Sequence, residues 1–302
     1  MNLLVTGAYA WSEKQLNKLR TLGHDVVFMQ YENSSLPCEA EWVEGVVCNG
    51  LFLHHPIEQF KNLMFIQLTS AGYDRVPMDY VEEHKIKIYN ARGVYSIPMA
   101  EFALCGVLQL YKKSRFFFEN QKEHKWEKHL ELLELYGKTV CIVGCGSVGQ
   151  ECAKRFCGFG CSVIGVDLKP YKNDFFESMI SIEEIETFIS KSDIVVLTLP
   201  LTEQTKGLFN SDMFAKMKKG AVLVNIARGA IVDTVALKNA LQNNLGGAVL
   251  DVFEEEPLGE NSPLWDMENV IITPHNSFVG EGNKERITQC IYKTLSRLGE
   301  NK

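Results

Sequence analysis

Three side chains suited to acid–base and anion chemistry each come shortly after a run of apolar, β-branched residues that is typical of a buried strand. They are Arg228 after residues 222–226, Glu256 past residues 249–252 and His275 past residues 270–273. Of the seven histidines, His275 alone directly follows such a run, and the other six lie in turns or charged helical stretches. Because open parallel sheets carry reactive groups beyond the carboxyl ends of their strands, we expect the three side chains to meet at one sheet edge.

An arginine, a histidine and a carboxylate together suit hydride exchange between a nicotinamide and a 2-oxo or 2-hydroxy acid. The guanidinium of Arg228 can hold a carboxylate at two points and polarise the adjacent C2 oxygen. The imidazole of His275 can donate a proton to that oxygen as hydride arrives, a role typically worth ~10²–10⁴-fold in rate. Glu256, on the other ring nitrogen, would fix the tautomer and keep the imidazole protonated.

The same three residues also have ordinary structural interpretations. Arg228 could form a salt bridge at a domain junction, Glu256 is one of three consecutive acids, and His275 could be a satisfied turn residue. Each of these alone is the commoner case. Their joint placement after three strands of one sheet favours the catalytic interpretation.

A glycine-rich turn supplies the cofactor site that this chemistry needs. The segment Gly144-Cys145-Gly146-Ser147-Val148-Gly149 lies between a β-branched run and a helical stretch, and a second strand at residues 162–166 ends on Asp167. In such a G-x-G-x-x-G turn the first glycine permits a tight turn, the second admits a pyrophosphate and the third lets helix and strand pack. Ser147 and Val148 open the helix, whose N-terminal N–H groups attract phosphates. The pattern predicts a Rossmann-type NAD site; the alternatives are a plain glycine turn and an S-adenosylmethionine site.

Asp167 predicts which dinucleotide is preferred. Its carboxylate would accept hydrogen bonds from the adenosine ribose hydroxyls and, being anionic, would repel a 2′-phosphate. We therefore expect NAD to be favoured over NADP, although Lys169 and Lys172 lie close enough in the sequence to weaken that preference.

The bulk composition limits the partners of the chain. It has 302 residues, 46% of them hydrophobic, and a formal net charge of −7, so it is long enough for two domains. Because phosphate binding needs a basic face, the acidic balance argues against a nucleic-acid partner. We recognise no signal peptide and no apolar stretch that approaches 18 residues, so we expect a cytoplasmic protein without a membrane partner.

The chain has nine cysteines, and no two of them form a Cys-x-x-Cys pair, so neither disulfides nor a metal site is expected. Cys145 lies in the glycine turn, where N–H groups favour anions. We therefore expect its thiolate to be stabilised there, and its alkylation to be blocked by bound cofactor.

Residues 2–91 alternate strand and helix signals. Strands are expected at residues 3–6, 25–29, 45–48, 65–68 and 86–89, with helices after Ser12, at residues 56–62 and at residues 77–84. This alternation predicts a doubly wound parallel sheet. The loop Ala71-Gly72-Tyr73 follows the fourth strand, and its small residues would let N–H groups face an anion; a plain turn is the alternative.

Beyond residue 98 the pattern changes. We expect a long helix at residues 99–118 and a charged helix at residues 120–135, connecting the two domains. The run Phe116-Phe117-Phe118 belongs either to a core or to an oligomer interface, since three adjacent helical residues cannot all face one core. Six further strands are expected at residues 139–143, 162–166, 194–199, 221–226, 248–252 and 270–273, and a final helix at residues 284–298 is expected to return to the first domain.

Several motifs taken together resemble the D-isomer-specific 2-hydroxyacid dehydrogenase family. They are the glycine turn, Thr198-Leu199-Pro200-Leu201-Thr202, Asn225-Ile226-Ala227-Arg228-Gly229, the stretch from Leu250 to Leu258, and Thr273-Pro274-His275. The resemblance covers almost the whole chain. It implies an NAD-dependent enzyme that interconverts a small 2-oxo acid, such as glyoxylate or hydroxypyruvate, and the D-2-hydroxy acid.

The resemblance also implies an architecture and a role for each matched position. The chain would be α/β, with a Rossmann-type NAD domain at residues 98–276 inserted in a flavodoxin-like substrate domain at residues 1–97 and 277–302, and it would form a homodimer through the cofactor domain. Arg228 would orient substrate, and His275, paired with Glu256, would be the acid/base. Pro200, Thr205 and Ile226 would contact the cofactor, Asp251 the nicotinamide amide, and the backbone of Ala71, Gly72 and Tyr73 the substrate carboxylate.

Two features leave the specificity open. Asn276-Ser277-Phe278 replaces small apolar residues that usually follow the histidine in the family, and Arg92, Tyr95 and Ser96 are either substrate contacts or hinge residues. The rival interpretations are a D-3-phosphoglycerate dehydrogenase, a formate dehydrogenase and a non-catalytic, NAD-sensing corepressor. The intact Arg, Glu and His set argues against the last two.

Overall fold

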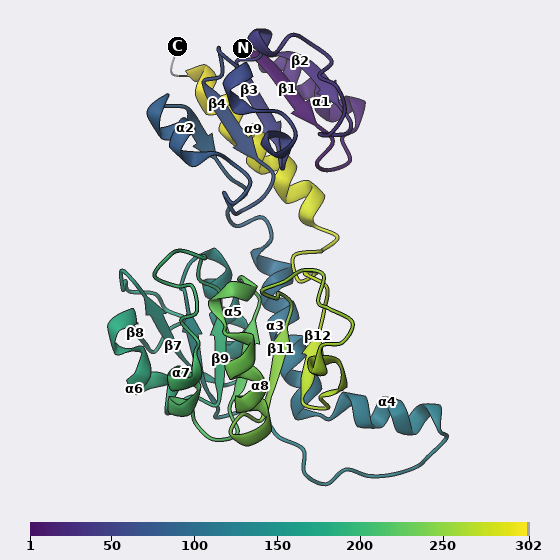
Figure 1. Cartoon of the computed structure of the whole chain (residues 1–302), viewed down its shortest axis with the longest axis vertical. Coiled ribbons are helices and arrows are strands. Elements are labelled where there is room, and N and C mark those ends of the chain that lie inside the picture. Colours follow the sequence, from purple (N-terminus) through teal and green to yellow (C-terminus); the bar gives the residue numbers. More distant parts are fainter. Residues whose placement is uncertain (301–302) are drawn as a thin grey trace. The chain divides into compact units, whose positions relative to one another are not determined.

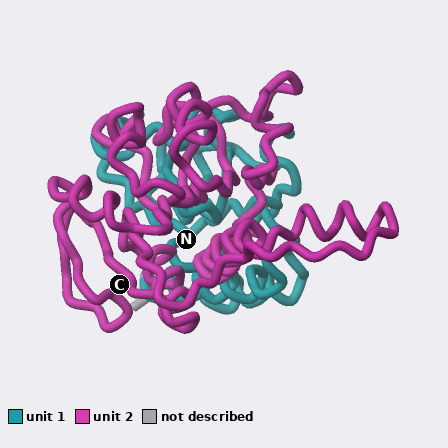
Figure 2. Tube along the Cα trace, turned by 90° about the horizontal axis from the view of Figure 1, so that it is seen from below, with its two compact units in different colours: residues 1–95, 280–302 teal, residues 96–279 magenta. Residues whose placement is uncertain are grey.

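The computed structural model describes residues 1–300 of the chain, with side chains as far as Arg297. The chain forms two compact units, which Figure 2 distinguishes by colour. Unit 1 comprises Met1–Tyr95 and the residues from Gly280 onward, and unit 2 comprises Ser96–Val279. Unit 2 is therefore one uninterrupted stretch, whereas unit 1 is assembled from two separate segments.

Unit 1 is a five-stranded parallel sheet in the order β2-β1-β3-β4-β5. Its strands are β1 (Asn2–Thr6), β2 (Asp25–Met29), β3 (Gly45–Cys48), β4 (Phe65–Leu68) and β5 (Lys87–Tyr89); its α-helices are α1 (Glu13–Thr21), α2 (Met78–Glu83) and α9 (Asn283–Glu300), with 3-10 turns at η1 (Ala40–Trp42), η2 (Leu51–Leu53) and η3 (Ile57–Gln59). β3 and β4 are buried at every position, as parallel strands covered on both faces must be. The expected doubly wound sheet is confirmed.

The final helix, α9, belongs to unit 1. Ile287, Ile291 and Leu295, spaced four residues apart, pack against the sheet side chains Leu3 and Val5. This confirms the prediction that the last helix returns to the first domain. The helix is amphipathic because only this one stripe of its surface is apolar.

Unit 2 is a seven-stranded parallel sheet in the order β12-β11-β10-β9-β6-β7-β8. Its strands are β6 (Thr139–Val143), β7 (Ser162–Asp167), β8 (Ser178–Ser181), β9 (Ile194–Leu197), β10 (Val222–Asn225), β11 (Gly247–Leu250) and β12 (Val270–Ile272); its α-helices are α3 (Ser96–Tyr111), α4 (Ser114–Lys122), α5 (Ser147–Gly158), α6 (Ile185–Ile189), α7 (Ser211–Lys216) and α8 (Thr234–Asn243), with 3-10 turns at η4 (Ile182–Glu184), η5 (Gly229–Ile231) and η6 (Pro263–Asp266). Figure 1 labels most of these elements.

Helices cover both faces of this sheet. Val107 of α3 and Phe156 of α5 are buried in a cluster on one face, and Phe214 of α7 and Leu237 of α8 in a cluster on the other. α3 approaches β11 so closely that a Cβ on Gly106 would lie 2.5 Å from a methyl carbon of Val249. Each strand of the sheet centre is therefore apolar on both sides, and its polar residues are confined to its ends.

Three expectations for secondary structure are wrong. The long helix of residues 99–118 is two helices, because Lys113 takes a left-handed conformation with φ +50° between α3 and α4. The charged helix expected at residues 120–135 stops at Lys122, and the segment after it has no regular structure through residue 135. The helix expected at residues 56–62 is only the turn η3. Helical spacing alone cannot show that a segment has no partner against which to pack its apolar side chains.

The second unit has one strand more than the six expected. β8 is a short edge strand beside β7, and none of its four residues is fully buried. Because it lacks the apolar run by which the other strands were recognised, the sequence gives little sign of it.

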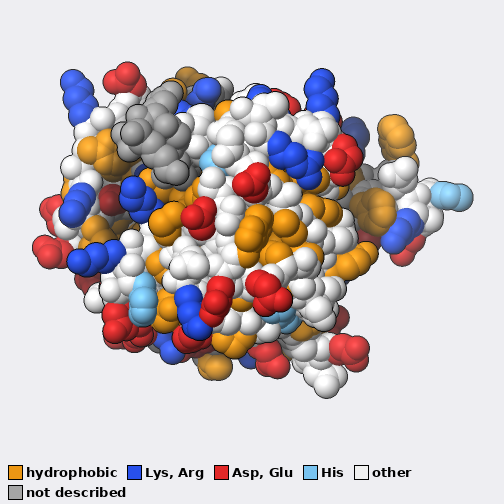
Figure 3. All heavy atoms as spheres, turned by 90° about the horizontal axis from the view of Figure 1, so that it is seen from above, with side chains coloured by type: hydrophobic (Ala, Val, Ile, Leu, Met, Phe, Trp, Pro, Cys, Tyr) orange, Lys and Arg blue, Asp and Glu red, His pale blue; other side chains and the backbone are white. Residues whose placement is uncertain are grey.

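Two surface properties bear on possible partners. None of the helices within residues 1–300 is long and apolar enough to cross a membrane. On the described part of the face shown in Figure 3, acidic and basic side chains are interspersed, and no basic patch gathers there.

Replacing Ile291 with alanine tests whether α9 is an integral part of unit 1. Ile291 is fully buried against the sheet, so the deletion leaves a cavity, and we expect the free energy of unfolding to fall by about 2–5 kcal/mol. Urea unfolding followed by the fluorescence of Trp11 and Trp42, both in unit 1, measures the change. The control Lys293→Ala alters the exposed face of the same helix and is expected to have little effect. Equal stability of the two variants would contradict this packing.

Candidate active site

Unit 2 places its predicted site residues just beyond the carboxyl ends of six neighbouring strands. In sheet order from β12 to β7, these ends lead to His275, then Asp251 and Glu256, then Arg228, Pro200, the glycine turn and Asp167. The chain changes direction across the sheet at β6, since β7 and β8 lie on one side of it and β9 to β12 on the other. Ligands of open α/β sheets bind at such a switch point, outside the carboxyl ends of the strands.

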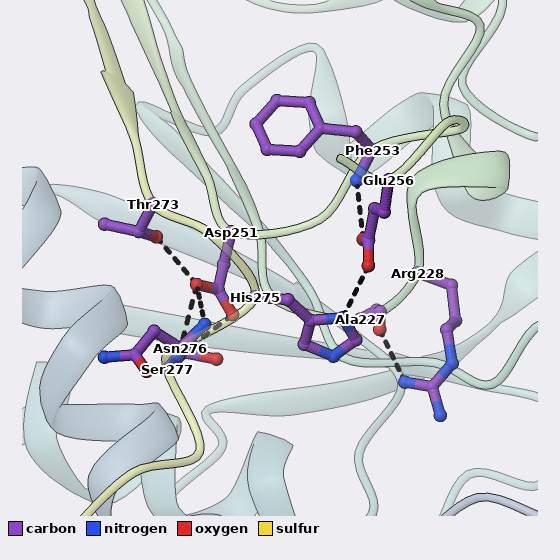
Figure 4. Close-up of polar contacts among 9 residues, drawn as sticks. All are labelled: Ala227, Arg228, Asp251, Phe253, Glu256, Thr273, His275, Asn276 and Ser277. Carbon is purple, nitrogen blue, oxygen red and sulfur yellow. Dashed lines mark hydrogen bonds and ion pairs between the residues drawn. The ribbon is translucent and has the colours of Figure 1, made fainter. Parts of the chain in front are cut away.

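The side chains of His275 and Glu256 form a direct contact. Nδ1 of His275 lies 2.9 Å from Oε2 of Glu256, and the other carboxylate oxygen accepts the N–H of Phe253 at 3.1 Å. Figure 4 draws both interactions. The two side chains are 43% and 38% exposed, so the pair is open to a ligand. With Nδ1 engaged by Glu256, Nε2 is the ring nitrogen through which His275 can exchange a proton.

The backbone that carries His275 is held by a buried acid. His275 has φ +50°, a left-handed conformation that residues other than glycine rarely adopt. Its N–H donates to the carbonyl of Asp251 at 2.8 Å. The carboxylate of Asp251, which is fully buried, accepts the Thr273 hydroxyl at 2.7 Å and the N–H groups of Asn276 and Ser277 at 2.7 and 3.0 Å. These bonds offset the cost of burying the carboxylate and fix the turn on both sides of the histidine.

Arg228 follows β10 in a turn that is tied to the strand. Buried Asn225 donates from Nδ2 to the Arg228 carbonyl at 3.1 Å and accepts the N–H of Ala227 at 3.1 Å. The guanidinium is half-buried, and its Nη1 donates to the carbonyl of Ala227 at 2.7 Å. The next residue, Gly229, touches the neighbouring loop: a Cβ there would lie 1.8 Å from the carbonyl carbon of Phe253. The arginine turn and the loop that leads to Glu256 are thus packed together, and only glycine fits between them.

The glycine turn fits a dinucleotide. Gly144 has φ +94°, and a Cβ on it would lie 2.6 Å from the backbone of Leu199. A Cβ on Gly149 would lie 2.2 Å from the Gly144 carbonyl, so this glycine allows the helix to pack on the strand. A Cβ on Gly146, by contrast, would meet nothing within 4 Å, which is the open space that a pyrophosphate needs. Gly146 is the N-cap of α5 and supplies no side-chain cap, so the first N–H groups of the helix can bind an anion.

Asp167 ends β7 beside this turn. Its Oδ2 accepts the N–H of Cys145 at 2.8 Å and its Oδ1 accepts the N–H of Lys169 at 3.2 Å. The carboxylate is therefore fixed at the rim of the glycine turn, half-buried, where the sequence predicts a ribose contact.

Three predicted cofactor contacts have structural roles of their own. Thr205 is buried, and its hydroxyl donates to the Pro200 carbonyl and accepts the Thr202 N–H, each at 2.8 Å. The side chain of Ile226 is buried in the core below the sheet edge, which leaves its backbone for a ligand. Contacts of Pro200, Thr205 and Ile226 with a cofactor remain predictions.

In unit 1, the loop after β4 is held by its carbonyl groups. The bonds run from Tyr95 Oη to Thr69 O, from Ala91 N to Ser70 O at 2.8 Å, from Asn90 Nδ2 to Ala71 O at 2.6 Å and from Ser70 Oγ to Gly72 O at 3.0 Å. The N–H groups of Ala71, Gly72 and Tyr73, by contrast, donate no hydrogen bond to any of residues 1–300. A loop with its carbonyls occupied and three successive N–H groups available suits an anion. Of the three possible hinge or substrate residues, Tyr95 thus shapes this loop.

The expectation of a stabilised Cys145 thiolate is wrong. The thiol points into the core and not into the turn, with Sγ 3.6 Å from the carbonyl oxygens of Ile142 and Val166. Burial, with the nearby Asp167 carboxylate, raises the pKa of Cys145 to about 12. The place of Cys145 in the glycine turn predicted where its backbone lies but not the direction of its side chain. All nine cysteines are free, and within residues 1–300 no group of three or more His, Cys, Asp or Glu side chains could hold a metal ion.

Two parts of this site were missed from the sequence. The sequence motif suggested a cofactor contact for Asp251 but not its role in building the histidine turn; the signal was an acid placed directly after a fully buried strand. Gly229 was quoted only as part of a motif. Its presence after Arg228 signals that another backbone passes close by.

A parallel sheet with a glycine turn, an acid at the end of the next strand and an Arg, Glu and His set at its other strand ends defines a nicotinamide-dependent oxidoreductase. Residues 104–277 match the model of the D-isomer specific 2-hydroxyacid dehydrogenase, NAD binding domain. The chain belongs to the D-isomer-specific 2-hydroxyacid dehydrogenase family, as its motifs predicted. Unit 2 contains the NAD-binding domain of this family.

Relatives support the assignment. The chain is 34% identical over 248 residues to the hydroxypyruvate reductase of Thermotoga maritima, covering 80% of each chain. It is 34% identical over 221 residues to the D-3-phosphoglycerate dehydrogenase of Archaeoglobus fulgidus; the match covers 72% of this chain but only 42% of that protein. A D-isomer specific 2-hydroxyacid dehydrogenase from Xanthobacter autotrophicus Py2, solved in complex with NADPH and MES, is 28% identical, has a TM-score of 0.80 and is covered over 95% of its length by 99% of this chain.

Alkylation of Cys145 tests the orientation of its thiol. With a pKa near 12, its thiolate fraction at pH 8 is on the order of a thousandfold below that of an ordinary thiol, and it rises only as pH approaches the pKa. We expect iodoacetamide to modify exposed Cys105 and leave Cys145 intact, with or without NAD, as read by peptide mass spectrometry. If Cys145 were labelled rapidly and NAD prevented the labelling, the thiol would instead lie in the glycine turn as a stabilised thiolate.

Proposed function

We propose that this protein reduces a small 2-oxo acid to the D-2-hydroxy acid with NADH, and catalyses the reverse oxidation with NAD. The observation that carries this function is the pair of His275 and Glu256, at the ends of adjacent strands, with Arg228 at the end of the next strand. The name of the Thermotoga maritima relative makes hydroxypyruvate the first substrate to assay, followed by glyoxylate.

Two groups of the chain bind and polarise the substrate in this proposal. The guanidinium of Arg228 forms a two-point contact with the carboxylate and the C2 oxygen, which draws electron density away from C2. The available N–H groups of Ala71, Gly72 and Tyr73 hold the substrate carboxylate. Fixing the acid in this way converts part of the binding free energy into correct orientation of C2.

His275 moves the proton. NADH, when bound, supplies the hydride that adds to C2. Nε2 of His275 gives its proton to the C2 oxygen, so that the carbonyl becomes a hydroxyl and the imidazole becomes neutral; in the oxidation direction the neutral ring takes that proton back. Glu256 holds Nδ1 at 2.9 Å, which fixes the orientation of the ring and leaves Nε2 to exchange the proton.

The cofactor is assigned to the other strand ends of unit 2. The pyrophosphate is assigned to the turn around Gly146 and the N-terminus of α5, and the adenosine ribose to Asp167. Pro200, Thr205 and Ile226 are assigned to the middle of the dinucleotide. Asp251, which holds the histidine turn, is also proposed to meet the nicotinamide amide.

Variants of the three polar residues test this function. We expect His275→Ala and Arg228→Lys each to lower kcat for hydroxypyruvate reduction by about 10²–10⁴-fold, because each removes a group that acts on the C2 oxygen. The affinity for NADH, measured by fluorescence titration without substrate, should stay within about twofold, since neither residue belongs to the dinucleotide turn.

The matched control for the carboxylate is a neighbouring acid. Glu256→Gln should lower kcat strongly, whereas Glu255→Gln, an exposed position outside the pair, should leave it unchanged. The assay monitors NADH oxidation against a panel of 2-oxo acids. Full turnover by His275→Ala with any member of the panel, or no turnover by the wild type with every member, would overturn the proposed mechanism.

The proposal includes a homodimer formed through unit 2. Figures 1 and 2 show α4 and the segment after it projecting as an arm from the body of this unit. The arm exposes apolar side chains, with Trp126 98% accessible. The others are Phe117, Phe118, Leu130, Leu132, Leu133 and Tyr136. A cavity of about 830 Å³ lies at its base, lined by residues of α3, α4 and β12 that include Phe116 and Phe118. Monomers rarely expose such a contiguous apolar surface, so a second copy is its proposed cover.

Light scattering tests the dimer. The expected mass is about twice 34.1 kDa at micromolar concentration, and the double variant Phe118→Asp/Trp126→Asp should run as a folded monomer because each charge would be buried in the interface. Met64→Asp, at an apolar position of unit 1 that is about as exposed as Phe118, serves as the control and should remain dimeric. A monomeric wild type would contradict the proposal.

A cytoplasmic location is also part of the proposal. All nine cysteines are free thiols, a state that a reducing compartment maintains.

A further inference from the structure

Tyr171 bridges the loop after β7 to the glycine turn. Its hydroxyl donates to the carbonyl of Cys145 at 2.5 Å and accepts from Nε2 of Gln150 at 2.8 Å. Cys145 stands between the first two glycines of the turn, and Gln150 is in the first part of α5. The tyrosine is 38% exposed, so its ring lies at the surface and is not a core side chain.

The last residue of β7 and the loop after it therefore hold one residue of the glycine turn by both of its backbone groups. Asp167 accepts the N–H of Cys145 at 2.8 Å, and Tyr171 donates to its carbonyl. The N–H of Lys169 donates back to Asp167 at 3.2 Å, which closes the intervening residues into a compact turn. Asp167 and Tyr171 thus bind the two backbone groups of Cys145, in the turn to which the proposed function assigns the dinucleotide.

Opposite charges make the choice of cofactor depend on this loop. The carboxylate of Asp167 repels a 2′-phosphate on the adenosine ribose, whereas the exposed side chains of Lys169 and Lys172, on either side of Tyr171, would attract one. Because Asp167 accepts the Cys145 N–H, a loop that stays on the glycine turn also keeps this carboxylate at the rim of the turn, where it would repel a 2′-phosphate; movement of the loop would release it. The two hydrogen bonds of the Tyr171 hydroxyl oppose that movement.

We propose that Tyr171 is a specificity-determining residue. Its hydrogen bonds hold the loop of residues 168–172 against the glycine turn. The site then excludes a 2′-phosphate and selects NAD over NADP. The inference rests on the cofactor site of the proposed function, and it concerns binding rather than turnover. Tyr171 thus has a role in cofactor selection although it lies outside the G-x-G-x-x-G pattern. Gln150, as the second partner of the hydroxyl, is its positioning residue.

The test measures cofactor dissociation constants without substrate. For the wild type we expect NADH to bind at least about tenfold more tightly than NADPH, by fluorescence titration. Tyr171→Phe keeps the ring and deletes the hydroxyl, so the discrimination should fall about five- to tenfold, through weaker NADH binding, stronger NADPH binding or both. Gln150→Leu should change the ratio in the same direction. Tyr89→Phe, a half-exposed tyrosine of unit 1, is the control and should leave both constants unchanged.

Two further measurements locate the effect. Calorimetry with 5′-ADP and 2′,5′-ADP should reproduce the change, because these fragments differ only in where the second phosphate sits and contain no nicotinamide. Hydrogen exchange should show faster exchange at residues 144–150 in Tyr171→Phe. An unchanged NADH-to-NADPH ratio in this variant, or a wild type that binds both cofactors equally, would overturn the inference. Failure of every 2-oxo acid to react would instead count against the proposed function alone.

Discussion

The geometry of the candidate active site depends on one buried carboxylate. Asp251 lies at the end of β11 with no exposed surface, and it accepts one hydroxyl and two backbone N–H groups from the turn that follows β12. Without those donors an ion in this place would be costly, and without the ion the donors would lose their partner. Carboxylate and turn therefore stabilise each other. His275 holds a left-handed backbone in a turn that Thr273, before it, and Asn276, after it, bind to the same acid.

The order of strands in unit 2 then determines what can act together. β12, β11 and β10 are adjacent, so the histidine, the glutamate and the arginine come from three consecutive positions along one sheet edge. The glycine turn and Asp167 follow further along the same edge, past β9. An extended dinucleotide laid along this edge would have its phosphates at the helix N-terminus and its reactive end near the histidine. At Gly229 two loop backbones touch, so the turn that carries Arg228 and the loop that leads to Glu256 are packed against each other.

The sequence correctly predicted the features of the fold and the site that depend on buried strands. Its predictions were wrong for segments that have no partner to pack against. Four of the five strands of unit 1 and six of the seven in unit 2 are largely apolar runs. A parallel sheet carries the residues after such runs to one edge, which is why the pair of His275 and Glu256 could be expected. β8 has no such run. The segment after Lys122 has helical spacing but stands away from any core, so spacing was no guide to its conformation. The orientation of Cys145 and the bonds of Tyr171 depend on side-chain directions in loops, which residue types alone do not reveal.

The division of unit 1 into two chain segments has a consequence for synthesis. Unit 2 is contiguous, so all of its strands are synthesised before α9. The sheet of unit 1, in contrast, exposes Leu3 and Val5 until Ile287, Ile291 and Leu295 arrive to cover them. A nascent chain therefore carries a half-covered sheet of unit 1 until its last residues emerge, and during this interval chaperones or misassembly would act on it.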